Sequence, residues 1–207
     1  QAMDLETGPD GVVPGPDLRL RLAALMHDIG KPATRRFMPD GTVTFHAHDY
    51  VGARMTAKRM RALHFDKQTI KDVSRLVELH LRFHGYADSP WSDSAVRRYV
   101  TDAGPLLARL GCLTRADVTT GNRRKAAMLS HAYDDLERRI EALRQQEELA
   151  AIRPELDGQE IMAELGIKPG PEVGKAYKFL LDLRMERGPI GKELAREALH
   201  SWWATQQ

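Results

Sequence analysis

Apolar residues recur every three or four positions through most of the chain, which is the period of an amphipathic α-helix. In the first such segment these positions are Leu18, Leu22, Leu25, Met26 and Ile29. Asp17 suits a helix N-cap, and Gly30 followed by Pro32 indicates a helix end. The pattern therefore predicts a helix over residues 18–29 that carries His27 and Asp28 in its final turn.

The helical period is then interrupted. Residues 39–42, Pro-Asp-Gly-Thr, lie between Phe37 and the segment 43–45, which predicts a β-hairpin inserted between helices. Helical spacing resumes over about 48–63, where the residues expected to face inward are Val51, Met55 and Met60. In the helix that begins at Asp66, the positions expected to share one face are Ile70, Val73, Val77, His80, Leu81 and His84.

The remaining segments are also helical in pattern. We expect helices over about 92–100, from Pro105 through Asp117, and over about 122–149. The last of these has heptad-like apolar positions, Leu129, Tyr133, Leu136, Ile140 and Leu143, which suit either self-association or packing within the chain. A capping box at residues 157–160 predicts a helix that ends at Gly166, and two more follow over about 171–188 and 192–204. The predicted fold class is all-α with one small hairpin.

Composition changes this picture little. The 207 residues are 42% hydrophobic and 29% charged, with a net charge of +2, which is ordinary for a globular chain. The single cysteine, Cys112, cannot form an internal disulfide and indicates a reducing, cytoplasmic compartment. The opening residues 1–5 have the pattern of the last turn of an interrupted helix, so we expect a piece of a longer chain.

Candidate chemistry centres on histidine and aspartate. His27 and Asp28 end one helix, His48 begins another, His80 and His84 are four residues apart, and Asp117 ends a fourth segment. Imidazole nitrogens and carboxylate oxygens from converging helices can hold a divalent cation that activates water. The alternative for each histidine alone is a packed, hydrogen-bonded residue. His84 is either remote from the metal or a substrate contact, whereas His46, His64, His131 and His200 are expected elsewhere.

Four blocks of sequence carry a resemblance. Residues 23–32, AALMHDIGKP, resemble the signature of HD-domain phosphohydrolases. Residues 45–53, FHAHDYVGA, and 113–122, LTRADVTTGN, resemble blocks of the bacterial CCA-adding tRNA nucleotidyltransferase and poly(A) polymerase family, and so do LDGQEIM (156–162), LGI (165–167) and PGPEVG (169–174). The sequence style of these blocks is similar to that of actinobacterial members of the family.

The resemblance implies an HD domain over residues 1–125 and a helical tRNA-binding body and tail domain over 126–207. The family's nucleotidyl-transfer head has a Gly-Ser loop and a paired-aspartate motif, and no such G-S…D-x-D pattern occurs in this sequence. The resemblance therefore implies the C-terminal part of a transferase for tRNA processing, without its catalytic head. It leaves open whether the parent adds CCA or poly(A).

Roles also follow from the resemblance. Primary metal ligands would be His27, Asp28 and Asp117, and His48 and His80 would hold a second metal or a substrate phosphate. Catalytic roles would fall to His27, Asp28, Lys31 and His48, in attack of activated water on a phosphomonoester or a 2′,3′-cyclic phosphodiester. Lys31 equally suits a favourable interaction with the helix dipole. The metal could be Mn, Ni, Mg, Fe or Co, bound weakly because the family's upstream histidine has no counterpart before His27.

RNA is the expected partner. Basic clusters occur at residues 35–36, 58–61, 97–98 and 123–125, and Arg123, Arg124 and Lys125 are the preferred contacts because they directly follow the Asp117 block. Three functions compete: the HD and RNA-binding part of a nucleotidyltransferase, a metal-dependent phosphohydrolase active by itself, and a metal-free structural HD module. Salt-dependent tRNA binding without hydrolysis would favour the first function. Hydrolysis that is lost in Asp28→Ala would favour the second. A folding stability that does not change when metal is added would favour the third.

Overall fold

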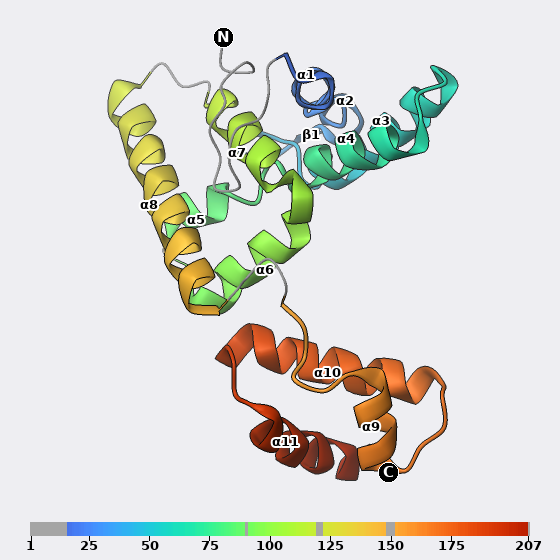
Figure 1. The fold of residues 1–207 in the computed structure, drawn as a ribbon. Helices are drawn as coiled ribbons and strands as arrows, with labels where there is room; N and C mark the ends of the chain where they lie inside the picture. Colours follow the sequence, from blue (N-terminus) through green and yellow to red (C-terminus); the bar gives the residue numbers. More distant parts are fainter. Residues whose placement is uncertain (1–15, 90, 119–121, 148–151, 207) are drawn as a thin grey trace. The chain divides into compact units, whose positions relative to one another are not determined.

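A computed structural model describes residues 16–89, 91–118, 122–147 and 152–206 (Figure 1). In chain order the elements are α1 (Leu18–Met26), α2 (Lys31–Thr34), β1 (Arg36–Phe37), β2 (Val43–Thr44), α3 (His48–Ala62), α4 (Lys67–Leu79), α5 (His84–Asp88), α6 (Asp93–Ala103), the 3-10 helix η2 (Gly104–Leu106), α7 (Leu107–Ala116), α8 (Arg123–Glu147), α9 (Gly158–Leu165), α10 (Pro171–Arg187) and α11 (Lys192–Ala204). The all-α prediction with one small hairpin is confirmed. No helix among the described residues is long and apolar enough to cross a membrane.

The chain packs as two compact units. The first contains residues 1–90 and 102–139, and the second contains residues 91–101 and 140–207. Helices α6 and α8 therefore each contribute residues to both units. The predicted domain boundary between residues 125 and 126 lies inside α8, before the point where this helix passes from the first unit to the second, and it stays a prediction. The expectation of an interrupted helix at residues 1–5 lies outside the described residues.

Helix α1 begins as its sequence predicts. The backbone N–H of Leu20 donates to the Asp17 carboxylate at 2.8 Å, which caps the helix. The same carboxylate accepts hydrogen bonds from Nε and Nη2 of Arg109, at 3.1 and 2.7 Å, which attaches the start of α1 to α7. Leu20 and Ala23 are fully buried, and α1 packs against α4 and α7.

Helix α1 ends earlier than its apolar pattern predicted. It stops at Met26, and residues 27–30 form a turn rather than a last helical turn. Two backbone hydrogen bonds of the tighter i to i+3 type close this turn, from Ile29 N to the Met26 carbonyl and from Lys31 N to the Asp28 carbonyl, both 3.0 Å. Because Pro32 then opens α2, His27 and Asp28 lie between two helices.

Helix α3 faces the core differently from its prediction. Met60 is fully buried as expected, but Val51 and Met55 are only half-buried. The inward positions of the first half of α3 are instead small residues, Gly52, Ala53 and Thr56. The reason is the close packing of this half of the helix against neighbouring backbone, where larger side chains do not fit.

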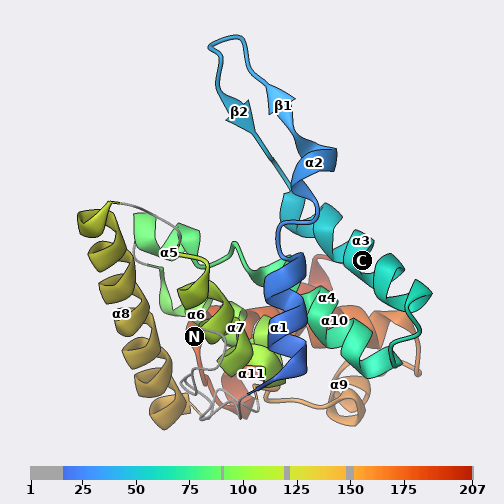
Figure 2. The same cartoon turned by 90° about the horizontal axis from the view of Figure 1, so that it is seen from above.

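The hairpin was predicted correctly. Strands β1 and β2 pair antiparallel, with Arg36 opposite Thr44 and Phe37 opposite Val43. Asp40 Oδ1 accepts a hydrogen bond from Thr42 N at 2.9 Å, which fixes the turn. Figure 2 shows the hairpin extending away from the helices of the first unit, and Phe37 is 72% exposed.

The prediction that His80 and His84 share one helix face was wrong. Helix α4 ends at Leu79 with His80 as its C-cap, and His84 begins the separate short helix α5. His80 is 1% exposed, whereas His84 is exposed. The apolar stripe of α8 is buried within the chain, since Leu129, Tyr133 and Leu136 and the later Ile140 and Leu143 are all at most 8% exposed.

The second unit has its own small core. Asp157 and Glu160 form the predicted capping box at the start of α9, and Gly166 ends that helix in the left-handed conformation. The core residues are Leu156, Ile161, Ala176, Leu180, Ala195 and Leu199. Phe179 and Trp202 stack beside this core with ring centroids 5.0 Å apart.

The Asp17–Arg109 pair predicts a pH-dependent contribution to stability. Burial alone would raise the pKa of Asp17, but the hydrogen bonds from Arg109 and Leu20 outweigh it and hold this pKa below 3.8. Asp17→Asn keeps a capping side chain and removes the charge, so we expect the free energy of unfolding to fall by about 1 kcal/mol at pH 7, after allowance for solvent screening. A lowered pKa contributes stability above the unfolded value, and this stability is lost as the pH falls through the lowered pKa of Asp17, so the difference should shrink steadily in acid.

Urea unfolding at pH 7 and at a series of lower pH values measures this difference. Asp66→Asn is the matched control, because Asp66 caps α4 in the same way but has no chelating arginine. An equal loss of stability in both variants would contradict a special contribution from Arg109.

Candidate metal centre

Four separate segments bring histidine and aspartate side chains to one place in the first unit. His27 and Asp28 lie in the turn after α1, His48 is the first residue of α3, His80 follows α4 and Asp117 follows α7. Each residue thus lies at a helix end, where the chain direction changes. The structure therefore brings together all five of the predicted metal ligands.

The three histidine rings are oriented in the same way. Nδ1 of His27, His48 and His80 each lies within hydrogen-bond distance of the carbonyl three residues earlier, at 2.8, 2.9 and 2.6 Å. A ring that donates from Nδ1 presents Nε2 for another contact. A hydrogen bond from Nδ1 to a backbone carbonyl is typical of histidines that ligate metals, because it fixes both the tautomer and the ring orientation.

The Nε2 atoms meet near Asp28. Ligand atoms of Asp28, His48 and His80 all lie within 4.8 Å of one another. The ring of His80 makes edge contacts with the rings of His27 and His48, with centroids 5.3 and 5.4 Å apart. Nε2 of His48 and Nε2 of His80 are buried and lack a hydrogen-bond partner among the described residues. Because buried polar atoms are nearly always satisfied, these two orphaned nitrogens fit a ligand that binds between them.

His27 and Asp117 form a pair on one side of the cluster. Nε2 of His27 lies 3.1 Å from Oδ1 of Asp117 and 3.5 Å from Oδ2 of Asp28. The hydrogen bond with Asp117 raises the pKa of His27 above 6.5. Burial acts to raise the pKa of Asp117, but the hydrogen bond with His27 and the nearby imidazoles hold it below 3.8. A proton and a cation therefore compete for Nε2 of His27.

His80 has the opposite electrostatic setting. Its burial, together with the charges of His27 and His48, lowers the pKa of His80 below 6.5. His80 is therefore neutral at pH 7, and its Nε2 carries the lone pair that a metal ion needs.

Lys31 lies at the edge of the cluster. Its Nζ is 2.6 Å from Oδ2 of Asp28 and 5.9 Å from the centre of the Phe45 ring. The ammonium group therefore offsets the charge of Asp28. This contact replaces the helix-dipole interaction considered from sequence, because Lys31 begins α2 and does not end α1.

Gly30 sets the distance between two of the ligand segments. A Cβ atom on Gly30 would lie 2.2 Å from the His48 carbonyl oxygen and 2.8 Å from the Gly52 backbone nitrogen. The turn that carries Asp28 therefore packs backbone to backbone against the start of α3, which carries His48. The sequence pattern predicted Gly30 only as a helix end and did not reveal this role. The signal for it was a glycine in each segment, Gly30 two residues after Asp28 and Gly52 one helical turn after His48.

The remaining histidines lie outside the cluster. His46, His64, His131 and His200 are exposed, and His200 pairs with Glu164 at 3.2 Å. These positions agree with their expected exclusion from the metal centre. His84 is close enough to Asp117 to lower its pKa through charge, although its side chain is exposed.

The predicted RNA contacts begin α8. Side chains of Arg123, Arg124 and Lys125 are exposed, and backbone N–H groups of Arg124 and Lys125 donate to Oδ1 of Asn122 at 3.0 and 3.2 Å. Asn122 therefore caps the helix through backbone N–H groups. The three basic side chains take no part in this cap and face solvent.

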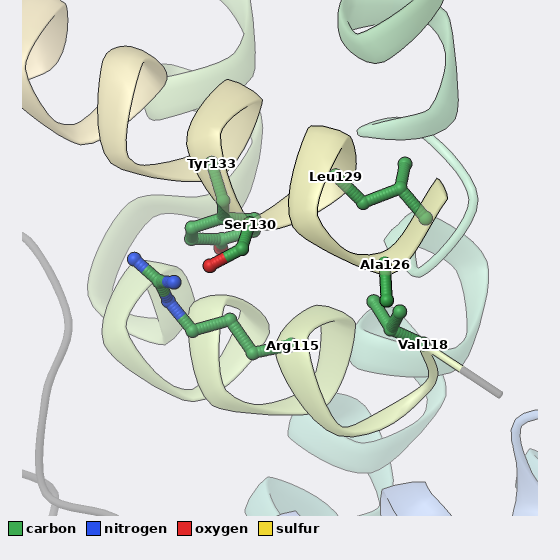
Figure 3. A pocket seen from close by; sticks show the side chains of 6 residues that line it. All are labelled: Arg115, Val118, Ala126, Leu129, Ser130 and Tyr133. Atoms are coloured by element: carbon green, nitrogen blue, oxygen red, sulfur yellow. The ribbon is translucent and has the colours of Figure 1, made fainter. Parts of the chain in front are cut away.

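A cavity of about 160 Å³ lies between α7 and α8 near this helix start. Figure 3 shows its lining residues, Arg115, Val118, Ala126, Leu129, Ser130 and Tyr133. The Arg115 guanidinium lies 4.2 Å from the centre of the Tyr133 ring and is paired with Asp134 and Glu137, at 2.7 and 2.9 Å. Since two carboxylates engage Arg115, we assign this residue a role in attaching α8 to α7.

The fold and the cluster together define a class of protein. A bundle of helices with a histidine–aspartate pair after its first described helix, and further candidate ligands at later helix ends, fits an HD domain. The family model for the HD domain matches residues 2–122. The chain belongs to the HD domain family.

Two curated relatives are similar over nearly the whole chain. The CC-adding tRNA nucleotidyltransferase of Thermus thermophilus is 38% identical over 193 residues, which cover 91% of this chain and 41% of the relative. The A-adding tRNA nucleotidyltransferase of Deinococcus radiodurans is 36% identical over 196 residues, which cover 93% of this chain and 43% of the relative. The chain thus spans about two fifths of the length of these relatives.

The close approach at Gly30 yields a prediction for stability. Gly30→Ala places a methyl group against backbone atoms that cannot rotate away, so we expect the free energy of unfolding to fall by about 3 kcal/mol or more. Gly174→Ala is the control, since a Cβ on Gly174, within α10, meets nothing within 4 Å. Alanine there should stabilise the helix by up to about 1 kcal/mol. Chemical denaturation of both variants measures the two effects, and similar values would contradict the packing role of Gly30.

Proposed function

We propose that this chain is the HD and RNA-binding part of a tRNA nucleotidyltransferase. The identity of 38% and 36% to a CC-adding and an A-adding enzyme, over more than 90% of the chain, carries this proposal. Because the sequence has no Gly-Ser loop and paired-aspartate motif, nucleotide addition is assigned to another part of the parent protein. An enzyme that acts on tRNA, with one buried free thiol, suits the cytoplasm.

The metal centre has a proposed role of its own. Asp28, His48 and His80 are the residues best placed to hold a divalent cation, and His27 and Asp117 complete the set when the proton between them is lost. A bound cation would polarise a phosphoryl oxygen and lower the pKa of a coordinated water. The mixture of imidazole and carboxylate ligands suits Mn, Fe, Co or Ni, and also Mg.

The chain's own residues would then orient a phosphate ester. Lys31 lies beside Asp28 with its side chain 39% exposed, so it can contact a phosphate oxygen while it remains near the carboxylate. The backbone bonds at Nδ1 hold His27 and His48 with Nε2 toward the same space. These features support hydrolysis of a phosphomonoester or a 2′,3′-cyclic phosphodiester as the second candidate function.

A third candidate is a metal-free structural module. The observation that favours it is the existing pairing of charges, since His27 pairs with Asp117 and Lys31 pairs with Asp28. In this case the two ion pairs join the turn 27–31 to the rest of the unit without a cation.

Replacement of Asp28 tests the metal centre. We expect Asp28→Ala to bind Mn²⁺ at least about 100-fold more weakly than the unmodified chain, because it removes the carboxylate that lies within 4.8 Å of the ligand atoms of both His48 and His80. The same variant should lose hydrolysis of 2′,3′-cyclic AMP and keep its affinity for tRNA. Isothermal titration calorimetry with Mn²⁺ and an assay for released nucleotide measure these quantities.

Asp182→Ala is the control for this replacement, because Asp182 is an exposed carboxylate of α10 outside the cluster. If the unmodified chain binds no Mn²⁺ and shows no change in melting temperature when Mn²⁺ is added, the structural module is supported. Metal binding without hydrolysis would reject the phosphohydrolase and retain the metal centre.

RNA binding is proposed for the start of α8. Arg123, Arg124 and Lys125 follow one another at an exposed helix start, and none of them forms an ion pair with the other described residues. Cations without carboxylate partners can contact the phosphate backbone. Such contacts account for much of the affinity of proteins for nucleic acids.

The triple variant Arg123→Gln, Arg124→Gln, Lys125→Gln tests this assignment. We expect tRNA affinity to fall roughly tenfold or more at 0.1 M salt, and the slope of log K against log salt to become less steep by about 2 to 3. Filter binding or fluorescence anisotropy over a salt series gives both values. An unchanged salt slope would show that these side chains do not contact phosphates.

A further inference from the structure

Helix α3 has a side that none of the proposed functions uses. The side that faces the core of the first unit carries its buried residues, His48, Gly52, Ala53, Thr56 and Met60. The opposite side carries a row of exposed residues at spacings of four, four and three, which places them along one line of the helix. This row, which we call the α3 row, consists of Tyr50, Arg54, Lys58 and Arg61.

The cations of the α3 row are free. Arg54, Lys58 and Arg61 form no ion pair or side-chain hydrogen bond with any described residue. Arginines elsewhere in the first unit behave differently, since Arg19 pairs with Asp72 at 2.8 Å and Arg109 pairs with Asp17 at 2.7 Å. The charge of the α3 row is therefore directed to solvent.

Little negative charge lies near this row on its own helix. Asp49 is the one acidic residue of α3, and it lies in the first turn. The row also borders a groove of about 310 Å³, lined by Val51, Arg54, Met55 and Lys58. Unpaired cations one helical turn apart, beside a groove, offer a series of contacts to an extended polyanion.

We propose that the α3 row binds the sugar-phosphate backbone of an RNA strand. Arg54, Lys58 and Arg61 contact successive phosphates, and Tyr50, which is 58% exposed, stacks on a base or ribose. The row begins two residues after His48, so an RNA strand along α3 has one end close to the metal centre.

An acidic membrane fits this surface less well than RNA does. A helix that binds a membrane surface inserts an apolar face between lipids. The apolar face of α3 is already buried in the core of the protein, as the 0% exposure of Met60 shows. The exposed row itself consists of three cations and one tyrosine, so it is suited to contacts with charged groups and to stacking by one aromatic ring.

This inference shares the RNA partner of the proposed function and assigns it a second surface. The test compares tRNA binding by the unmodified chain and two double variants over a salt series. One is Arg54→Gln with Lys58→Gln on α3. The matched control is Lys67→Gln with Lys71→Gln on α4, because these lysines are also four residues apart, exposed and unpaired among the described residues.

We expect the α3 variant to bind tRNA roughly tenfold more weakly at 0.1 M salt, and its slope of log K against log salt to become less steep by about 2. The affinity and slope of the α4 control should change little. Tyr50→Ala should weaken binding without a change in slope, because stacking releases no counterions. Each variant is also mixed with phosphatidylserine vesicles.

The outcomes separate the two proposals. Equal losses of tRNA affinity in the α3 and α4 variants would overturn the proposed role of the α3 row. Binding to vesicles that is tighter than binding to tRNA would also overturn it. If the α3 variant is unaffected but the 123–125 variant loses affinity, the proposed function stands and the α3 row fails. No tRNA binding by the unmodified chain would overturn both.

Discussion

The contact between Gly30 and the first turn of α3 is the constraint on which the candidate metal centre depends. At this point two backbone segments lie so close that a single methyl group on Gly30 would overlap the His48 carbonyl oxygen. The approach brings the turn that carries His27 and Asp28 to the start of the helix that carries His48. It also accounts for the small inward residues of α3, since Gly52 and Ala53 leave room for this turn and for α4.

The charge state of each group in the cluster depends on the partner with which it is paired. His27 and Asp117 stabilise each other's charged forms, and Lys31 offsets Asp28. His80 is buried at the middle of the cluster, and burial keeps its ring neutral. The cluster thus contains both charged pairs and uncharged ligand atoms. A cation that bound Nε2 of His27 would compete with a proton there, whereas Nε2 of His48 and of His80 have no hydrogen-bond partner among the described residues.

The distribution of arginine and lysine separates cations that join helices from cations without a partner among the described residues. Arg19, Arg109 and Arg115 pair with carboxylates and join helices within the first unit. The cations of the α3 row and of residues 123–125 have no such partners among the described residues. Net charge is only +2, so composition alone does not predict affinity for RNA. The pairing of individual side chains locates the surfaces where that affinity is expected.

The sequence by itself determined the helices, the hairpin and the capping residues, because periodicity and capping are local properties of the chain. It also singled out the five residues of the candidate metal centre, whose role as ligands stays a prediction. Its errors came from the tertiary structure. Tight i to i+3 hydrogen bonds ended α1 at Met26, α4 ended before His80, and close backbone packing turned Val51 and Met55 away from the core. Only the folded structure decided that His84 stays exposed and that Nε2 of three histidines faces one aspartate. Such convergence depends on contacts between residues far apart in the chain, and no local pattern of a single sequence records those contacts.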